Sequence, residues 1–165
     1  MDVQITPASA AERDALTALV QLYAYDLSDL FSADVGDDGR YKTPPLDPYW
    51  SGDPRRHPFL IRVDGKLAGF ALVHQQSRLT GDESVTDMAE FFVLRRFRRH
   101  GVGERAAAWL FDKFRGPWEV RQRSVNLPAT AFWRRAIGRY SDGKFTEEQV
   151  DDERWRGPVQ RFVSG

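Results

Sequence analysis

The chain has 165 residues, a length typical of one domain with a well-buried core. It contains no cysteine, which excludes disulfides, thiolate metal sites and a cysteine nucleophile and favours a cytoplasmic location. Lys and Arg total 24, as do Asp and Glu, so the chain as a whole lacks the charge that attracts proteins to nucleic acid or anionic membranes. The N-terminus does not resemble a signal peptide and no apolar run can span a bilayer, so we expect one soluble domain over residues 1–165.

The first predicted elements are a strand and a long helix. Residues 3–6 favour a strand, and Ser9 and Glu12 have the spacing of a capping box that opens a helix. The helix is expected to reach about Asp29, because apolar side chains recur along it at helical spacing. These side chains are Leu16, Leu19, Val20, Tyr23, Leu27 and Leu30. Residues 33–58 then lose this periodicity and are rich in Gly and Pro, which predicts a long loop of the kind that is often functional or mobile.

Three strands are expected in the middle of the chain. Residues 59–63 and 67–74 are rich in β-formers and flank Asp64-Gly65, a strong signal for an antiparallel hairpin. Residues 85–94 form a third run, which is typical of a central strand buried on both faces. Glu90 lies within this apolar run, and a carboxylate in such a place is conspicuous.

The C-terminal part is predicted to alternate helices and strands. The expected elements are a helix at 102–114, a strand at 118–125, a short helix from Asn126 to Gly138, and closing strands at 144–146 and 158–163 around the acidic stretch 147–156. The strand at 85–94, the helix that follows it and the strand after that helix together form a βαβ unit. We see no repeat and no linker between domains.

A basic, glycine-containing loop separates the strand that ends at Leu94 from the next helix. Its basic side chains are Arg95, Arg96, Arg98, Arg99, His100 and Arg105. The segment Gly101-Val102-Gly103 stands at the start of the helix, where free backbone N–H groups and the helix dipole favour anions. The loop is therefore a candidate phosphate-binding site.

Several interpretations of this loop compete. Residues 101–106 formally satisfy the dinucleotide fingerprint G-x-G-x-x-A, but that fingerprint has no long basic insertion between strand and glycine. A triphosphate P-loop lacks its Gly-Lys-Ser or Gly-Lys-Thr here. A solvated basic turn that caps an ordinary helix stays open, as does a nucleic-acid contact, although the neutral total charge argues against the latter.

The pattern Arg98-x-x-Gly101-x-Gly103 after an apolar strand resembles the signature of the GNAT superfamily of CoA-dependent N-acetyltransferases. The order of the predicted elements and the series Asn126-x-x-Ala129-x-x-Phe132-Trp133 are similar to that family too, so the resemblance covers most of the chain. It implies an α/β (α+β) fold with a mixed, largely antiparallel twisted sheet, splayed at a CoA cleft and flanked by helices. It also implies acetyl-CoA as cosubstrate.

The resemblance implies a coenzyme site that runs from the predicted strand into the helix. Backbone N–H groups of the loop would bind the pyrophosphate, and the end of the strand would pair with the pantetheine arm. The residues concerned are Phe92, Val93, Leu94, Arg98, Arg99, His100, Gly101, Val102, Gly103, Glu104, Asn126 and Trp133. Asn126 is equally well explained as a helix cap. The histidines lack paired spacing, so no metal site is expected.

Two residues are candidates for catalysis. An alkyl amine is almost entirely protonated at neutral pH, so its attack on a thioester requires a base, and Glu90 on a buried strand could serve. A carboxylate that is merely satisfied on a polar face is the alternative. The family often uses a tyrosine to protonate the departing thiolate, but Trp133 stands at the matching position. Tyr140 is a possible substitute.

The expected acceptor is an amine of a small molecule or a protein, whose identity the sequence does not give. The side chains Asp34, Asp37, Asp38, Tyr41, Tyr49 and Trp50 could attract a cationic amine, although acidic loop residues are most often simply solvated. We expect no nucleic-acid or membrane partner, and either a monomer or a homodimer. The departure at Trp133 leaves open a non-catalytic acyl-CoA sensor or interaction module of the same fold.

Overall fold

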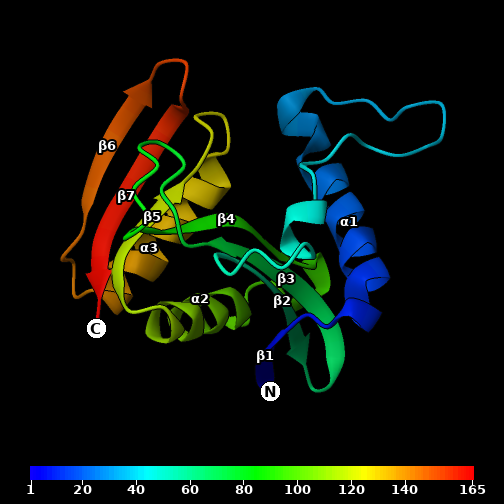
Figure 1. Cartoon of the computed structure of the whole chain (residues 1–165), viewed down its shortest axis with the longest axis horizontal. Coiled ribbons are helices and arrows are strands. Elements are labelled where there is room, and N and C mark those ends of the chain that lie inside the picture. The colour runs from blue at the N-terminus through cyan, green and yellow to red at the C-terminus, as the bar shows by residue number, and fades with distance from the viewer.

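The computed structural model describes all residues, 1–165, and contains a seven-stranded sheet in the order β1-β2-β3-β4-β5-β7-β6. The strands are β1 (Val3–Pro7), β2 (Arg56–Val63), β3 (Lys66–His74), β4 (Thr86–Val93), β5 (Gly116–Arg121), β6 (Thr146–Asp151) and β7 (Arg156–Ser164). The α-helices are α1 (Arg13–Phe31), α2 (Val102–Lys113) and α3 (Leu127–Tyr140). All neighbouring strands are antiparallel except β4 and β5, so the expected fold class is confirmed (Figure 1).

The local signals in the first half of the chain produce the structures they predict. The carboxylate of Glu12 accepts a hydrogen bond from the Ser9 N–H at 3.1 Å, and a short 3₁₀ turn leads into α1. Asp64 and Gly65 both have positive φ, at 49° and 78°, as a two-residue hairpin turn of the primed type requires. The hairpin of β2 and β3 is therefore fixed by its own turn.

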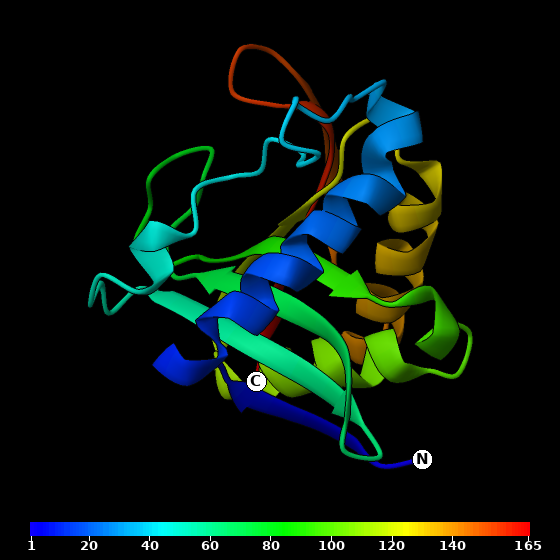
Figure 2. The ribbon, with the colours of Figure 1, turned by 90° about the vertical axis from the view of Figure 1, so that its right-hand side faces the viewer.

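Helices cover both faces of the sheet. Helix α1 crosses one face and packs on Leu60, Phe70, Leu72 and Phe92, while α2 and α3 pack on the other face around Phe111 (Figure 2). Side chains of β2 alternate between the two cores, as a strand buried on both faces requires. Strand β4 is central, as predicted.

The sheet opens between β4 and β5. These strands start side by side and pair only at Thr86 with Trp118 and at Asp87 with Glu119. Beyond Asp87 the two strands diverge, and the edge of β4 that faces β5 has no strand partner. The chain crosses from β4 to β5 through α2, so the predicted βαβ unit and the predicted splay are both present.

Several predicted elements have other bounds in the structure; β2, for example, begins at Arg56, within the predicted loop. The strand expected at 144–146 is wrong: the strand lies at Thr146–Asp151, within the stretch expected to connect two strands. It is an edge strand in which only Val150 is buried, so its charged side chains face solvent and give no apolar signal. Strand β5 ends at Arg121, earlier than expected, and α3 continues through Gly138 to Tyr140.

Candidate active site

A cleft of about 1570 Å³ lies where β4 and β5 diverge. It is lined by α1, β4, the start of α2, the end of β5, α3 and the loops 33–49 and 76–81. Single-ligand pockets are usually about 300–1000 Å³, so this cleft has room for two molecules side by side.

The basic loop forms one wall of the cleft. After β4 the chain makes a 3₁₀ turn at Arg95–Phe97, and then Arg99 and Gly101 take positive φ values of 64° and 76°. This path turns the chain into α2 and leaves the backbone N–H groups from Arg99 to Glu104 without an acceptor in the protein. A row of free donors at a helix N-terminus is suited to phosphate.

The two glycines of the loop serve different purposes. Gly101 has a left-handed conformation with open space where a Cβ would stand, so glycine is needed there for the backbone and leaves room for a ligand. A Cβ on Gly103 would lie 3.0 Å from the Phe132 ring, so glycine is needed there for packing of α2 against α3.

Arg98 holds the loop against helix α1. Its guanidinium donates to the Val93 carbonyl oxygen at 2.7 Å and to Asp26 at 2.7 Å, and Arg95 also pairs with Asp26 at 2.8 Å. Burial opposes the charge of Asp26, but these hydrogen bonds outweigh it and lower the pKa of that carboxyl. The Arg98 side chain therefore bonds to other protein groups and fixes the loop. The sequence analysis had instead placed Arg98 among the residues that bind the coenzyme.

Helix α3 adds a basic rim. Arg135 and Arg139 both line the cleft and donate to Glu104, in the first turn of α2, at 3.0 Å and 2.9 Å. Sequence reasoning missed these two arginines, although their spacing of four residues places them on one face of a helix. The pairing satisfies Glu104 but leaves both arginines exposed beside the free N–H groups.

Glu90 lies on the wall of the cleft because of a bulge in β4. The register with β3 shifts between Leu72 and Val73, which pair with Glu90 and Met88 and leave Ala89 as the extra residue. Met88 belongs to the α2 and α3 side of the sheet, while Ala89 packs on the α1 side. The bulge thus turns Glu90 toward α1.

A tyrosine of α1 contacts this carboxylate. The Tyr23 hydroxyl donates to Glu90 Oε2 at 2.7 Å. Burial raises the pKa of Glu90, while the hydrogen bond from Tyr23 and the charge of Arg121 oppose the rise. Burial and the charge of Glu90 in turn raise the pKa of Tyr23 well above its usual value, so that hydroxyl stays protonated. Sequence reasoning counted Tyr23 only as part of the apolar stripe.

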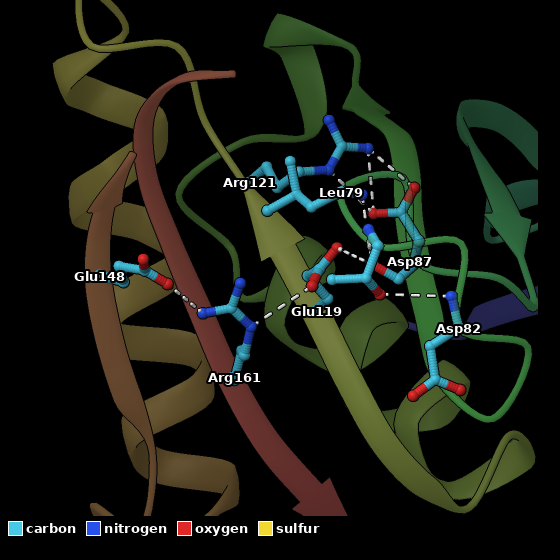
Figure 3. A network of polar contacts seen from close by, with 9 residues as sticks. Leu79, Asp82, Asp87, Glu119, Arg121, Glu148 and Arg161 are labelled. Atoms are coloured by element: carbon cyan, nitrogen blue, oxygen red, sulfur yellow. Dashed lines mark hydrogen bonds and ion pairs between the residues drawn. The ribbon is translucent and has the colours of Figure 1, made fainter. Parts of the chain in front are cut away.

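An ion pair bridges the point where the sheet opens. Arg121, 5% exposed, donates to both oxygens of Asp87, 2% exposed, at 2.7 and 3.0 Å. Figure 3 shows this pair beside a second one, in which Glu119 accepts from Arg161 at 3.3 Å. Glu119 also accepts a hydrogen bond from Ser77 at 3.0 Å. Both carboxylates of the last paired rung, Asp87 and Glu119, are therefore satisfied.

The remaining predicted residues divide into those at the cleft and those elsewhere. Phe92, Val93, Val102, Asn126 and Trp133 line it, and Asn126 also accepts from the Ala129 N–H at 3.3 Å as a helix cap. Trp133 is 6% exposed and packs edge-on against Phe91 and Phe132.

Several candidates do not reach the cleft lining. Leu94 and His100 are absent from it, as are Asp37, Asp38 and Trp50 of the long loop. Tyr140 is absent too: its hydroxyl donates to Asp112 at 2.7 Å, and its ring packs on Phe111 and Phe162. The structure therefore places the substitute acid Tyr140 away from Glu90. No three His, Asp or Glu side chains gather in a group that could hold a metal ion.

A splayed sheet, a free helix N-terminus and a carboxylate in one cleft agree with the family model for the acetyltransferase (GNAT) family, which matches residues 21–138. The chain belongs to this family. The match begins within α1 and ends in α3, so it includes most of the cleft lining, from Tyr23 to Arg135. Acetyl transfer from acetyl-CoA is the activity of the family, and the acceptor differs between its members.

Solved structures share the fold of this GNAT chain at low sequence identity. An acetyltransferase from Thermus thermophilus matches with a TM-score of 0.69 and 15% identity, over 99% of this chain and 97% of that one. The ribosomal-protein-alanine N-acetyltransferase of Brucella melitensis matches with a TM-score of 0.64 and 17% identity, over 97% and 99%. A Bacillus subtilis acetyltransferase in complex with CoA matches with a TM-score of 0.58 and 12% identity, over 97% and 96%. No curated protein sequence matches significantly.

The fold of this GNAT chain contains no helix that is both long and apolar enough to cross a membrane.

Proposed function

We propose that this protein transfers an acetyl group from acetyl-CoA to an amine by direct attack on the thioester, with Glu90 as general base. The observation that carries the proposal is that one cleft contains both a free helix N-terminus and a partly buried carboxylate on β4, next to its open edge. When bound, acetyl-CoA supplies an acyl group already activated as a thioester. We further propose that the whole chain acts as one domain in the cytoplasm.

The donor half of the cleft suits coenzyme A in both charge and shape. The N–H groups from Arg99 to Glu104 would hold the pyrophosphate, and Arg135 and Arg139 add positive charge beside them. The unpaired edge of β4 at Phe92 and Val93 would accept the pantetheine arm as an added strand. Asn126 and Trp133 also line the cleft.

Glu90 would remove the proton that keeps the acceptor amine unreactive. An alkyl ammonium has a pKa near 10.4, and a base is most effective when its own pKa lies near the working pH. Burial raises the pKa of Glu90 towards the working pH, and the hydrogen bond from Tyr23 fixes the orientation of the carboxylate. Tyr23 would hold the base in place without donating its own proton.

The departing thiolate requires little assistance, because a thiol pKa near 8.5 makes it a fair leaving group. Trp133 has no acidic proton to give, and the Tyr140 hydroxyl donates to Asp112 at the C-terminal end of α2. The absence of a tyrosine at Trp133 favours one alternative, a module that binds acyl-CoA without turnover.

Thermal unfolding with and without acetyl-CoA tests the donor site. A ligand at a hundred times its dissociation constant stabilises the native state by about 2.7 kcal/mol, which raises Tm by roughly 5–10 °C for a chain of this size. We expect Gly101→Asp to abolish the shift, because it puts a charged side chain where phosphate would lie. Gly39→Asp is the matched control, since Gly39 has nearly the same φ, 75° against 76°, and equally open space.

Thiol release in the presence of a panel of amines then tests the base. We expect turnover to fall by about 10²–10⁴-fold in Glu90→Gln while the acetyl-CoA shift persists. No shift in the wild-type protein would refute the donor site. A shift without turnover of any amine would support the non-catalytic module instead.

A further inference from the structure

Trp155 organises a group of arginines at one end of the cleft. It lies in the connection between β6 and β7, half-buried, and its indole N–H donates to the Gln122 carbonyl oxygen at 2.9 Å. The guanidinium carbons of Arg121 and Arg123 each lie 4.6 Å from the ring centroid, and that of Arg78 lies 5.9 Å from it. The loop after β3, which carries Arg78, and the end of β5 with the residues that follow it, which carry Arg121 and Arg123, therefore bring their cations to one aromatic ring.

Two of these three arginines have no carboxylate partner. Arg121 is neutralised by Asp87 in the ion pair described above. Arg78 and Arg123 form no ion pair with the protein, although both line the cleft. The contact with Trp155 restrains the guanidinium of Arg123, at 4.6 Å, more than that of Arg78, at 5.9 Å, so less side-chain entropy is lost when Arg123 binds an anion.

The carboxylates of the cleft do not compensate for these charges. Asp26, Asp87 and Glu104 are each paired with arginines of their own. Among the lining carboxylates, only Asp34 and Glu90 have no ion pair, and Glu90 is bonded to the Tyr23 hydroxyl. Among the residues that line the cleft, those around Trp155 thus carry excess positive charge.

This positive group lies within electrostatic reach of the proposed base. Arg121 pairs with Asp87, which stands three residues before Glu90 on β4. The charges of Arg121 and Arg78 also oppose the rise that burial causes in the pKa of Glu90. When the amine of an acceptor approaches Glu90, another group of the same molecule would therefore contact the free guanidinium groups of Arg78 and Arg123. A cationic partner such as a polyamine would be repelled there.

We propose that the acceptor is a small amino acid, whose amine is placed at Glu90 and whose carboxylate is bound by Arg78 and Arg123. This inference rests on the proposed function. In the transfer, the ammonium loses one proton to Glu90, and the nitrogen forms a bond to the acetyl carbonyl carbon. The carbon–sulfur bond then breaks, and the nitrogen gives up a second proton to solvent as the neutral amide forms. The sulfur leaves with the electron pair of that bond and is protonated from solvent, so the products are an N-acetyl amino acid and CoA.

Matched pairs of acceptors test the inference, each an α-amino acid and its carboxamide, which lacks the negative charge. We expect kcat/KM to be about 10- to 100-fold higher for the acid than for the amide, since charge-assisted hydrogen bonds to the carboxylate are lost in the amide. The double variant Arg78→Gln, Arg123→Gln should lose this preference mainly through KM. Arg115→Gln, an exposed arginine outside the cleft lining, is the control and should keep it.

A direct binding measurement separates this inference from the donor assignment. Amino acids should raise Tm in the wild-type protein and not in the double variant, while acetyl-CoA should raise it in both. Equal or faster turnover of amides or polyamines, or an unchanged preference in the double variant, would overturn the inference and leave the donor site intact. A third outcome is that amino acids bind through both arginines while acetyl-CoA does not stabilise the protein. That outcome would refute the donor site and leave the acceptor inference intact.

Discussion

Replacement of Tyr23 by Phe would show whether its hydroxyl controls the ionisation of Glu90. The hydroxyl donates to Glu90 Oε2 at 2.7 Å and lowers the pKa of that carboxyl. A hydrogen bond to a charged group contributes about 1.5–3 kcal/mol, and 1.36 kcal/mol corresponds to one pKa unit. Because a hydroxyl can also bond to the protonated acid, only part of this energy distinguishes the two forms. We expect Tyr23→Phe to raise the pKa of Glu90, because the ionised form loses about 1–2 kcal/mol of stabilisation relative to the protonated form.

The sign of the effect on activity follows from the role of a base. Glu90 must be ionised to accept a proton, so kcat/KM rises with pH through its pKa in the free enzyme. A higher pKa moves the acid limb of the profile to higher pH. Below that limb the variant should be about tenfold slower than the wild-type protein, and at higher pH the two should converge.

The assay is the pH profile of kcat/KM for one amine, measured by thiol release. The same amine in both proteins cancels the ionisation of the substrate, so the difference belongs to the protein. Tyr25→Phe is the matched control, because Tyr25 lies on the same helix with 64% of its surface exposed. Superimposed acid limbs for Tyr23→Phe and the wild-type protein would refute the reasoning, as would an unchanged profile in Glu90→Gln.

Three further changes test the energetics of the fold and the site. Arg121→Met leaves the buried carboxylate of Asp87 unpaired, and we expect a loss of about 3–5 kcal/mol in urea unfolding. Gly69→Ala places a methyl group against the Phe92 backbone carbonyl, which cannot move freely within a sheet, so a loss of about 3 kcal/mol is expected by the same measurement. Glu104→Gln removes a negative charge beside the free N–H groups and releases Arg135 and Arg139. Acetyl-CoA should therefore bind more tightly in calorimetry, although the helix loses about 0.3–1 kcal/mol of stability.

Features that depend on neighbours in sequence were predictable. Ser9 and Glu12, Asp64 and Gly65, and the loop before Gly101 each act through residues a few positions apart, and the structure contains all three as expected. The family resemblance rested on the same local signals and on the order of the elements, and it is confirmed.

Features that depend on contacts between distant segments were not predictable. The bond from Tyr23 to Glu90 joins residues 67 positions apart, and the Asp87–Arg121 pair joins residues 34 apart. The bulge at Ala89 has no sequence signal, because the run Met88 to Val93 reads equally well as a regular strand. Strand β6 was missed because it is an exposed edge strand held by backbone hydrogen bonds to β7. Such a strand does not require apolar side chains, so its sequence gives no strand pattern.

The splay divides the sheet into two blocks. One contains β1, β2, β3 and β4, and the other contains β5, β7 and β6. The blocks share only two rungs of backbone pairing, at Thr86 and Asp87. Backbone amides of β4 that face the gap are not protected by a neighbouring strand, so their hydrogens should exchange with solvent faster than those that bond to β3. A ligand bound along this edge would accept hydrogen bonds from these amides and would link the two blocks, so that they open to solvent together. Its binding would therefore appear as slowed amide exchange in a strand whose structure hardly changes.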